Sequence, residues 1–279
     1  MDSISVESWP APGKLNLFLH ITGRREDGYH LLQTVFQFFD YGDSLQFEIT
    51  NNGVISRETE IVGVPPEQDL IIRAAEMLQQ RSGTMYGTRI KITKRLPMGG
   101  GIGGGSSDAA TTLVALNRLW QIGLSTQELA EMGLKLGADV PVFIHGRACW
   151  AEGVGELITP IELDEPWYII LKPQCEVPTK DIFSDSALTR DTTYMKMPAF
   201  QEELGNDCEA VVRKRFPLVS QALDWLSQYG KAKLTGTGAC MFAAYNTKEE
   251  AQKVLDKKPD WLEGFIAKGL NYSPLQSKL

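Results

Sequence analysis

The chain has 279 residues, of which 43% are hydrophobic and 23% are charged, and its net charge is −7 at neutral pH. This composition is typical of a folded globular protein and excludes wholesale disorder. The acidic balance argues against general binding to nucleic acid or to an acidic membrane surface, and the length is sufficient for two hydrophobic cores.

No feature of the sequence indicates export or membrane insertion. Residues 1–12 include acidic side chains and lack an apolar core, and no later stretch reaches the roughly 18 apolar residues that a membrane helix needs. We therefore expect a cytoplasmic protein. Its four cysteines are spaced too widely for a zinc motif or a disulfide framework, which predicts buried free thiols and no metal site made of protein side chains. They are Cys149, Cys175, Cys208 and Cys240.

Hydrophobic periodicity predicts a mixture of strands and helices in the first half of the chain. In chain order, the predicted elements are a strand at 15–21, a turn at 41–43, a strand at 45–49, a helix at 70–80 capped by Asp69, a strand at 89–93, a helix that starts after residue 107, and a helix at 126–136 ended by Gly137.

A break at 158–166, where two prolines bracket acidic residues, precedes the second half. The elements predicted there are a strand at 167–171, a loop at 181–203 over a site, a helix at about 207–228, a strand at 231–234, a turn at 236–238, a strand at 241–245, a helix that begins with the capping box Thr247-x-x-Glu250, and a strand near Phe265. The order β-α-β-β-α-β is that of a ferredoxin-like domain.

The most distinctive segment is 97–107, which reads Pro-Met-Gly-Gly-Gly-Ile-Gly-Gly-Gly-Ser-Ser between a predicted strand and a predicted helix. Glycines allow positive φ and close approach of a ligand, and a helix N-terminus attracts anions, above all phosphate. A flexible linker is the alternative interpretation, although linkers do not usually join two elements so tightly.

Three known phosphate motifs fit this segment poorly. A Walker A loop needs Lys and then Ser or Thr after its last glycine, whereas Gly105 is followed by Ser106 and Ser107. The dinucleotide pattern Gly-x-Gly-x-x-Gly matches from Gly99, but a glycine run satisfies many patterns, and an insert at 94–97 separates strand from loop. The remaining protein-kinase motifs are absent.

Two polar positions are candidates for chemistry. Lys14 and Asn16 alternate with leucines and share one face of the strand at 15–21, with Phe18 and His20 beyond them; a solvated face is the alternative. Asp139 precedes an apolar run and is either a turn or cap residue, or a group that accepts or orients the proton of an attacking hydroxyl.

Three further features have simple structural alternatives. Gly236-Thr237-Gly238 is a second glycine turn that also fits an ordinary hairpin. Tyr29-His30 pairs two aromatic rings, and a surface turn explains them equally. Phe183 is an apolar residue within the predicted loop, where a small core contact is sufficient to account for it.

Segments 12–16, 97–110 and 234–240 together resemble the three motifs of the GHMP small-molecule kinases, in the family's order. Segments 25–30, 136–141 and 271–275 extend the resemblance over essentially the whole chain. They are similar to one member of the family, whose acceptor is a cytidine-diphosphate-linked methylerythritol of the non-mevalonate isoprenoid pathway. The resemblance implies ATP-dependent phosphorylation of the 2-hydroxyl of that acceptor. A homoserine or mevalonate type of GHMP kinase is the alternative.

The resemblance also implies a fold and its cofactors. A ribosomal-protein-like ATP-binding domain would span residues 1–158, and a ferredoxin-like domain would span 159–279, which gives a two-domain α+β protein with ATP and acceptor in the cleft between them. Mg²⁺ would accompany ATP through phosphate oxygens. We expect a monomer or a weak homodimer with no nucleic-acid or membrane partner.

Residue roles follow from the same resemblance. Asp139 would be the catalytic base and would also contact the acceptor, while Lys14 would keep Asp139 ionised and make the acceptor hydroxyl more acidic. Asn16 would support this cluster, and Lys94 would lie near the nucleoside. The residues implied to surround the ATP phosphates are Pro97, Met98, Gly99, Gly100, Gly101, Ile102, Gly103, Gly104, Gly105, Ser106 and Ser107.

For the other end of the acceptor, the family pattern implies that Tyr29 and Phe183 sandwich the cytosine and that His30 hydrogen-bonds its edge. Three positions depart from the usual pattern of the family. Gly13 replaces a frequent Ala, which should only loosen a turn, and Thr237 replaces a common Ser. Asp69 replaces a frequent Asn, and since a carboxylate accepts hydrogen bonds but cannot donate them, we expect this side chain to donate no hydrogen bond to adenine.

Overall fold

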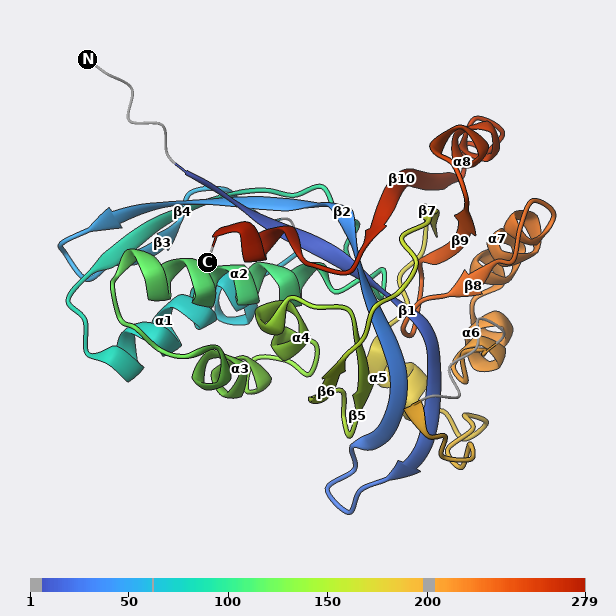
Figure 1. The fold of residues 1–279 in the computed structure, drawn as a ribbon, viewed down its shortest axis with the longest axis horizontal. Helices are drawn as coiled ribbons and strands as arrows, with labels where there is room; N and C mark the ends of the chain where they lie inside the picture. Colours follow the sequence, from blue (N-terminus) through green and yellow to red (C-terminus); the bar gives the residue numbers. More distant parts are fainter. Residues whose placement is uncertain (1–6, 62, 198–203, 279) are drawn as a thin grey trace.

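The computed structural model describes residues 7–61, 63–197 and 204–278. Two α+β halves share a continuous run of hydrogen-bonded strands in the order β3-β4-β2-β10-β7-β9-β8, with β1 and β5 also paired to β2 (Figure 1). The strands are β1 Ser8–Arg24, β2 His30–Thr50, β3 Ile55–Arg57, β4 Gly87–Thr93, β5 Cys149–Glu152, β6 Leu157–Pro160, β7 Trp167–Pro173, β8 Lys233–Leu234, β9 Met241–Tyr245 and β10 Leu262–Leu270.

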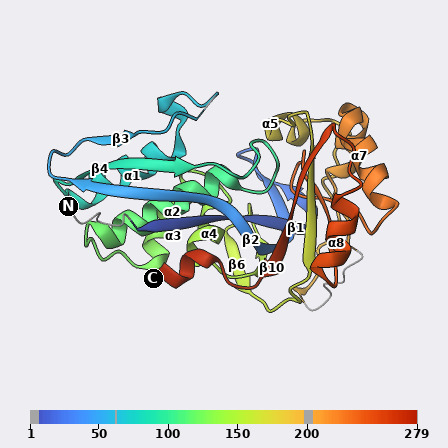
Figure 2. The same cartoon turned by 90° about the horizontal axis from the view of Figure 1, so that it is seen from above.

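Helices cover the sheet in both halves. They are α1 Leu70–Ser82, α2 Gly104–Leu119, α3 Thr126–Leu134, α4 Val140–His145, α5 Thr179–Phe183, α6 Glu209–Arg215, α7 Pro217–Ser227 and α8 Lys248–Leu255, with 3₁₀ turns η1 Pro66–Gln68 and η3 Pro274–Lys278. Figures 1 and 2 show α1 to α4 grouped beside the N-terminal strands, and α7 and α8 beside the C-terminal ones.

The predicted turn at 41–43 is wrong, because β2 runs through it. The register between β1 and β2 shifts between Pro12 and Lys14, so this segment is an irregularity within a long strand pair. Gly42 faces the partner backbone, where a Cβ would lie 2.4 Å from the Ala11 carbonyl oxygen. The buried Asp43 carboxylate accepts hydrogen bonds from the backbone N–H of Leu96 at 2.8 Å. A glycine and an aspartate therefore serve strand packing here, although they are typical turn residues.

The predicted helices at 70–80 and 126–136 are confirmed as α1 and α3, but α3 ends at Leu134 with Lys135 as its C-cap, before the Gly137 that was expected to end it. Asp69 caps α1 by accepting from the backbone N–H of Ile71, and Ser125 and Glu128 form a capping box at the start of α3. The helix expected after residue 107 begins earlier, at Gly104, inside the glycine run. Helix α4 was not predicted, although Pro141 in its first turn and Gly146 at its end are typical boundary residues.

The C-terminal half confirms the predicted β-α-β-β-α-β order. Its strands follow the spatial order β10-β7-β9-β8, and α7 and α8 pack on them. The helix predicted at 207–228 is two helices, because Pro217 follows Phe216 and starts α7. The predicted loop at 181–203 begins within α5, and its residues 198–203 lie outside the described part of the chain. The break predicted at 158–166 overlaps the end of β6.

The two halves have separate apolar cores, but each core contains residues from both the N-terminal and the C-terminal part of the chain. One cluster gathers N-terminal residues around α1 and α2 and also includes Leu275 from η3, while another lies beneath α6 and α7 and includes Leu19 and Ile21 of β1. The division of the chain at residue 158 therefore remains a prediction. Of the described helices, none is sufficiently long and apolar to span a bilayer.

The cysteines are free thiols, as the sequence predicts. Cys149, Cys208 and Cys240 are buried, and desolvation raises the pKa of each thiol to about 12. Cys175 is only half-buried.

Candidate active site

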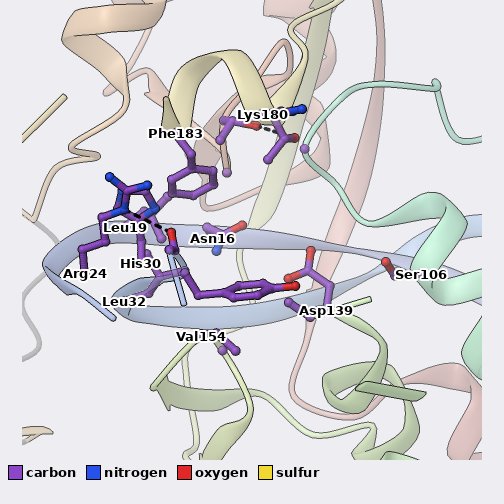
Figure 3. A pocket seen from close by; sticks show the side chains of 18 of the residues that line it. Asn16, Leu19, Arg24, His30, Leu32, Ser106, Asp139, Val154, Lys180 and Phe183 are labelled. Atoms are coloured by element: carbon purple, nitrogen blue, oxygen red, sulfur yellow. Dashed lines mark hydrogen bonds between the residues drawn. The ribbon is translucent and has the colours of Figure 1, made fainter. Parts of the chain in front are cut away.

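A cavity of about 740 Å³ lies between the two halves. Side chains from β1 and β2, the glycine run, the segment before α4, helix α5 and the 236–238 turn all reach it. Its volume is in the range of small-molecule sites. Figure 3 shows Asp139 and Ser106 at one end and Arg24, His30 and Phe183 at the other, so the cavity is elongated and chemically different at its two ends.

Lys14 organises the first end. Its side chain is 3% exposed, and its ammonium group donates to Asn16 Oδ1 at 2.6 Å and to the Gly101 carbonyl oxygen at 3.1 Å. Its third contact is an ion pair with Asp139 Oδ2 at 3.2 Å. A lysine has three N–H donors, and each has a partner here. The solvated-face interpretation of Lys14 is therefore wrong.

The residues on either side of Lys14 in strand β1 fix its position. Asn16 is buried, its backbone N–H donates to Thr235 Oγ1 at 2.9 Å, and its amide nitrogen donates to Thr34 Oγ1 at 3.0 Å. Gly13 does more than loosen a turn, because a Cβ there would lie 2.1 Å from the Phe39 ring. The ring packs against bare backbone, which fixes the strand immediately before Lys14.

Asp139 occupies the N-cap position of α4, but its side chain makes no cap hydrogen bond. The carboxylate is instead directed to Lys14 and remains 36% exposed, and it lines the cavity. The residues Val140 to Ile144 that follow are buried, so α4 is anchored in the N-terminal core. A carboxylate with one oxygen on a buried cation and access to a cavity is suited to accept a proton from a bound hydroxyl.

The glycine run is held against the 236–238 turn. The backbone N–H of Cys240 donates to the Gly100 carbonyl oxygen at 3.0 Å, and that of Ala239 donates to the Gly99 carbonyl oxygen at 3.2 Å. Gly101 has a φ of +73°, and a Cβ there would lie 2.5 Å from the Thr235 carbonyl oxygen. The hairpin interpretation of 236–238 is correct as far as it goes, since β8 and β9 pair, but this hairpin also fixes the loop.

The loop delivers the N-terminus of α2 to the cavity. Helix α2 begins at Gly104 after Gly103 in the left-handed conformation, and Ser106 in its first turn lines the cavity. The first N–H groups of a helix lack intrahelical acceptors and carry the positive end of its dipole. Ile102, by contrast, is buried in an apolar cluster with Leu15, and its carbonyl oxygen accepts a hydrogen bond from the backbone N–H of Lys14 at 3.0 Å.

Two other polar side chains at or beside the glycine run, Ser107 and Lys94, are also implied by the family resemblance to lie near ATP. Ser107 Oγ has no hydrogen-bond partner among the described residues. Lys94 does not line the cavity: its ammonium pairs with Asp43 and, at 2.8 Å, with Asp108. Desolvation disfavours the Lys94 cation, but the two carboxylates outweigh it and raise the pKa of Lys94. Desolvation also disfavours the charged form of Asp108, and this raises the pKa of its carboxyl group to about 7.

Asp69 is occupied by structural contacts. Besides capping α1, its carboxylate pairs with Arg57 Nε at 2.5 Å, and the side chain is 2% exposed. The carboxylate at this position, where relatives often have Asn, therefore forms an ion pair with Arg57.

At the second end of the cavity, aromatic rings lie beside the side chain of Arg24. His30 and Phe183 stack with ring centroids 5.0 Å apart, and Tyr29 is exposed and lines the same cavity. The short helix α5 brings Phe183 to β2, although the two segments are far apart in sequence. The three residues that the resemblance grouped therefore line one cavity, while the cytosine contacts expected of them remain a prediction.

Sequence reasoning missed four residues at this end, which are Arg24, Thr179, Lys180 and Arg190. Arg24 and Lys180 line the cavity, and so does Thr179, whose hydroxyl lies 3.0 Å from that of Thr237 and joins α5 to the 236–238 turn by a hydrogen bond. Arg190 contacts His30 from behind. The polar start of α5, Thr179-Lys180, was the available signal for two of them, whereas Arg190 has no local pattern.

Comparison with known proteins places the chain in a family. The profile of the GHMP kinases N terminal domain matches residues 69–147, and that of the GHMP kinases C terminal matches 195–262. The chain is 57% identical over 268 residues to the 4-diphosphocytidyl-2-C-methyl-D-erythritol kinase of Nitrosococcus oceani, covering 96% of each chain. It is 56% identical over 271 residues to the kinase of the same name from Pseudomonas syringae pv. syringae, covering 97% of this chain and 96% of the relative.

Solved structures are similar over the same length. A crystal structure of 4-(cytidine 5'-diphospho)-2C-methyl-D-erythritol kinase superposes with a TM-score of 0.82 at 29% identity, covering 94% of this chain and 99% of the other. The mevalonate kinase of Methanococcus jannaschii has a TM-score of 0.70 at 15% identity, covering 96% of this chain and 100% of the other, which shows a shared fold. The chain therefore belongs to the GHMP kinase family of ATP-dependent small-molecule kinases, in the group of 4-diphosphocytidyl-2-C-methyl-D-erythritol kinases.

Proposed function

We propose that the chain transfers the γ-phosphoryl group of ATP to the 2-hydroxyl of 4-diphosphocytidyl-2-C-methyl-D-erythritol, in the non-mevalonate pathway to isoprenoid precursors. The observation that carries the proposal is the two-ended cavity, with Lys14 and Asp139 beside the glycine run at one end, His30 and Phe183 at the other, and Tyr29 in the same lining. Such a cavity suits an acceptor with a hydroxyl at one terminus and an aromatic base at the other.

The phosphate end is suited to ATP. The N-terminus of α2 offers backbone N–H groups and a positive dipole end, and Ser106 adds a hydroxyl, so these groups would position the triphosphate. The described residues contain no cluster of three or more His, Cys, Asp or Glu side chains for a metal. Mg²⁺ fits such a site through phosphate and water oxygens with Asp139 as the available carboxylate, and when bound it would neutralise charge on the phosphate oxygens.

The proton transfer falls to Asp139. Its carboxylate would accept the proton of the acceptor hydroxyl while that oxygen attacks the γ-phosphorus, and the bond from phosphorus to the β,γ-bridging oxygen breaks to release ADP. Lys14 would hold Asp139 ionised and in place, because its ammonium bonds the carboxylate, Asn16 and the glycine run together. Most of the rate enhancement in such reactions comes from positioning and charge stabilisation.

Replacing Tyr29 tests the proposed base end. We expect Tyr29→Ala to raise KM for the cytidine acceptor roughly tenfold, since one stacking contact with a base is worth about 1–3 kcal/mol, and to leave KM for ATP within about twofold. Tyr272→Ala is a matched control, because Tyr272 is similarly exposed but lies outside the cavity. Equal effects of the two variants would place the cytosine elsewhere.

The alternative function is that of a homoserine or mevalonate type of GHMP kinase. A coupled assay of ADP formation with the cytidine acceptor, mevalonate and homoserine separates the possibilities. We expect turnover with the cytidine acceptor alone, because only this substrate uses the aromatic end. Turnover of mevalonate or homoserine, with none of the cytidine acceptor, would replace the proposal with the sibling function.

A further inference from the structure

Arg190 lies behind the aromatic end of the cavity and fixes several groups at once. Its Nη2 donates to the carbonyl oxygens of Phe183 at 3.0 Å and Asp185 at 2.6 Å, and its Nη1 donates to that of Leu188 at 3.0 Å. Its Nε donates to Nε2 of His30 at 3.1 Å. One guanidinium therefore holds both members of the His30–Phe183 stack, one by its ring and one by its backbone.

The bond to His30 has a chemical consequence because a guanidinium has donors and no acceptor. Nε2 of His30 must therefore present its lone pair to Arg190. A neutral imidazole with a lone pair on Nε2 carries its proton on Nδ1. No hydrogen bond joins Nδ1 to another described residue, and His30 lines the cavity, so the Nδ1–H is the ring's available donor.

We propose that Arg190 is a positioning residue that locks His30 in the neutral Nδ1–H tautomer, so that the ring donates a hydrogen bond to an acceptor atom on the pyrimidine edge of the substrate. The inference rests on the proposed function in placing the pyrimidine at this end. Cytosine offers two adjacent acceptors, O2 and N3, on one edge, which a fixed donor can read.

The charges around His30 support a neutral ring. Desolvation lowers the pKa of His30, and the cations of Arg190 and Arg24 lower it further. A protonated ring would lose the lone pair that Arg190 uses and would place a third positive charge beside two arginines. The geometry and the electrostatics therefore favour the same form of the ring.

The tautomer is directly measurable in the free protein. The chain has three histidines, so a long-range ¹H–¹⁵N correlation spectrum of the full chain labelled with ¹⁵N-histidine resolves each ring, and His30→Gln identifies the His30 signals. We expect a protonated Nδ1 and an unprotonated Nε2 at neutral pH. A protonated Nε2 in the wild-type chain would overturn the proposal, whatever the variants do.

Arg190→Met tests the cause, with Arg215→Met as the matched control. Arg215 also supports α5, since it donates to the Asp181 carbonyl oxygen at 3.0 Å and pairs with Asp185, but it has no bond to His30. We expect Arg190→Met to release the Nδ1–H tautomer and to weaken binding of cytidine 5′-diphosphate by about tenfold in calorimetry, the effect of one lost hydrogen bond to a base. Arg215→Met should retain the tautomer and bind within about twofold of wild type.

Each outcome of this comparison is informative. Retention of the tautomer in Arg190→Met, or an equal loss of cytidine 5′-diphosphate binding in Arg215→Met, would mean that Arg190 only supports the segment around α5. Kinetics add a second readout, because a positioning role raises KM for the acceptor while kcat and KM for ATP change little. If the chain proved to phosphorylate another acceptor, the proposed function would fail while the tautomer result still stood.

Discussion

Asp139→Asn should lower kcat by roughly 10³-fold, within the range of about 10²- to 10⁴-fold for loss of general base catalysis, and leave ATP affinity nearly unchanged. The amide has nearly the shape of the carboxylate but cannot take a proton. Asp139 makes no cap bond to α4, so the fold should tolerate the change. Steady-state kinetics with a saturating acceptor, together with calorimetric ATP binding, measure both quantities.

Lys14→Met sharpens this prediction through a double-mutant cycle. The thioether side chain fills the space beside Phe36, over whose ring the ammonium lies at 5.1 Å, but it cannot pair with Asp139. If Lys14 acts through Asp139, the double variant should be scarcely slower than Asp139→Asn alone. Fully additive losses would separate the two roles, and a wild-type kcat in Asp139→Asn would remove Asp139 from the chemistry.

Gly101→Ala should lower the thermal unfolding midpoint by roughly 6 °C or more, equivalent to about 3 kcal/mol in a chain of this size. The residue has a left-handed φ of +73°, which disfavours an L side chain, and its Cβ would lie 2.5 Å from the Thr235 carbonyl oxygen. Neither obstacle is relieved by rotation of a side chain, because the obstructing atoms belong to the backbone. ATP binding should weaken as well, since the loop must move away from Lys14.

Gly105→Ala is the control for this change within the same glycine run. Its φ is ordinary for a helix, and its Cβ would lie 3.6 Å from Leu70 Cδ1, a normal contact. Alanine favours a helix over glycine by about 1 kcal/mol, so the midpoint should stay level or rise slightly. Calorimetric unfolding scans of both variants test the pair. A similar fall in both midpoints would show that the run tolerates no side chain anywhere and that the specific contacts of Gly101 are unimportant.

The sequence predicted best what local patterns encode. The caps Asp69 and Thr247 and the alternation in β1 and β4 require only near neighbours, so the elements around them were found. The turn expected at 41–43 failed because Gly42 and Asp43 satisfy contacts with a distant strand and with the backbone at Leu96. Long-range contacts of this kind can require glycine or aspartate within a strand, although both residues are typical of turns.

In the candidate site, too, local features were predictable from the sequence, whereas contacts between distant segments were not. The glycine run was recognisable as a candidate phosphate loop from its own composition, but the close contacts of Gly101 come from the 235–238 backbone, which sequence patterns do not place. Lys14 and Asp139 are 125 positions apart, and only the family resemblance joined them before the fold did. Arg190 remained unseen because its partners lie on β2 and around α5.

The position of the transferred phosphate tests the central claim most directly. The purified chain is incubated with ATP, Mg²⁺ and 4-diphosphocytidyl-2-C-methyl-D-erythritol, and the product is examined by ³¹P NMR with coupling to the carbon skeleton. The proposed function predicts a new monophosphate ester on the 2-hydroxyl with the diphosphate bridge intact, because Asp139 lies at the opposite end of the cavity from His30 and Phe183. Phosphate on another hydroxyl, or ADP release without acceptor phosphorylation, would contradict it.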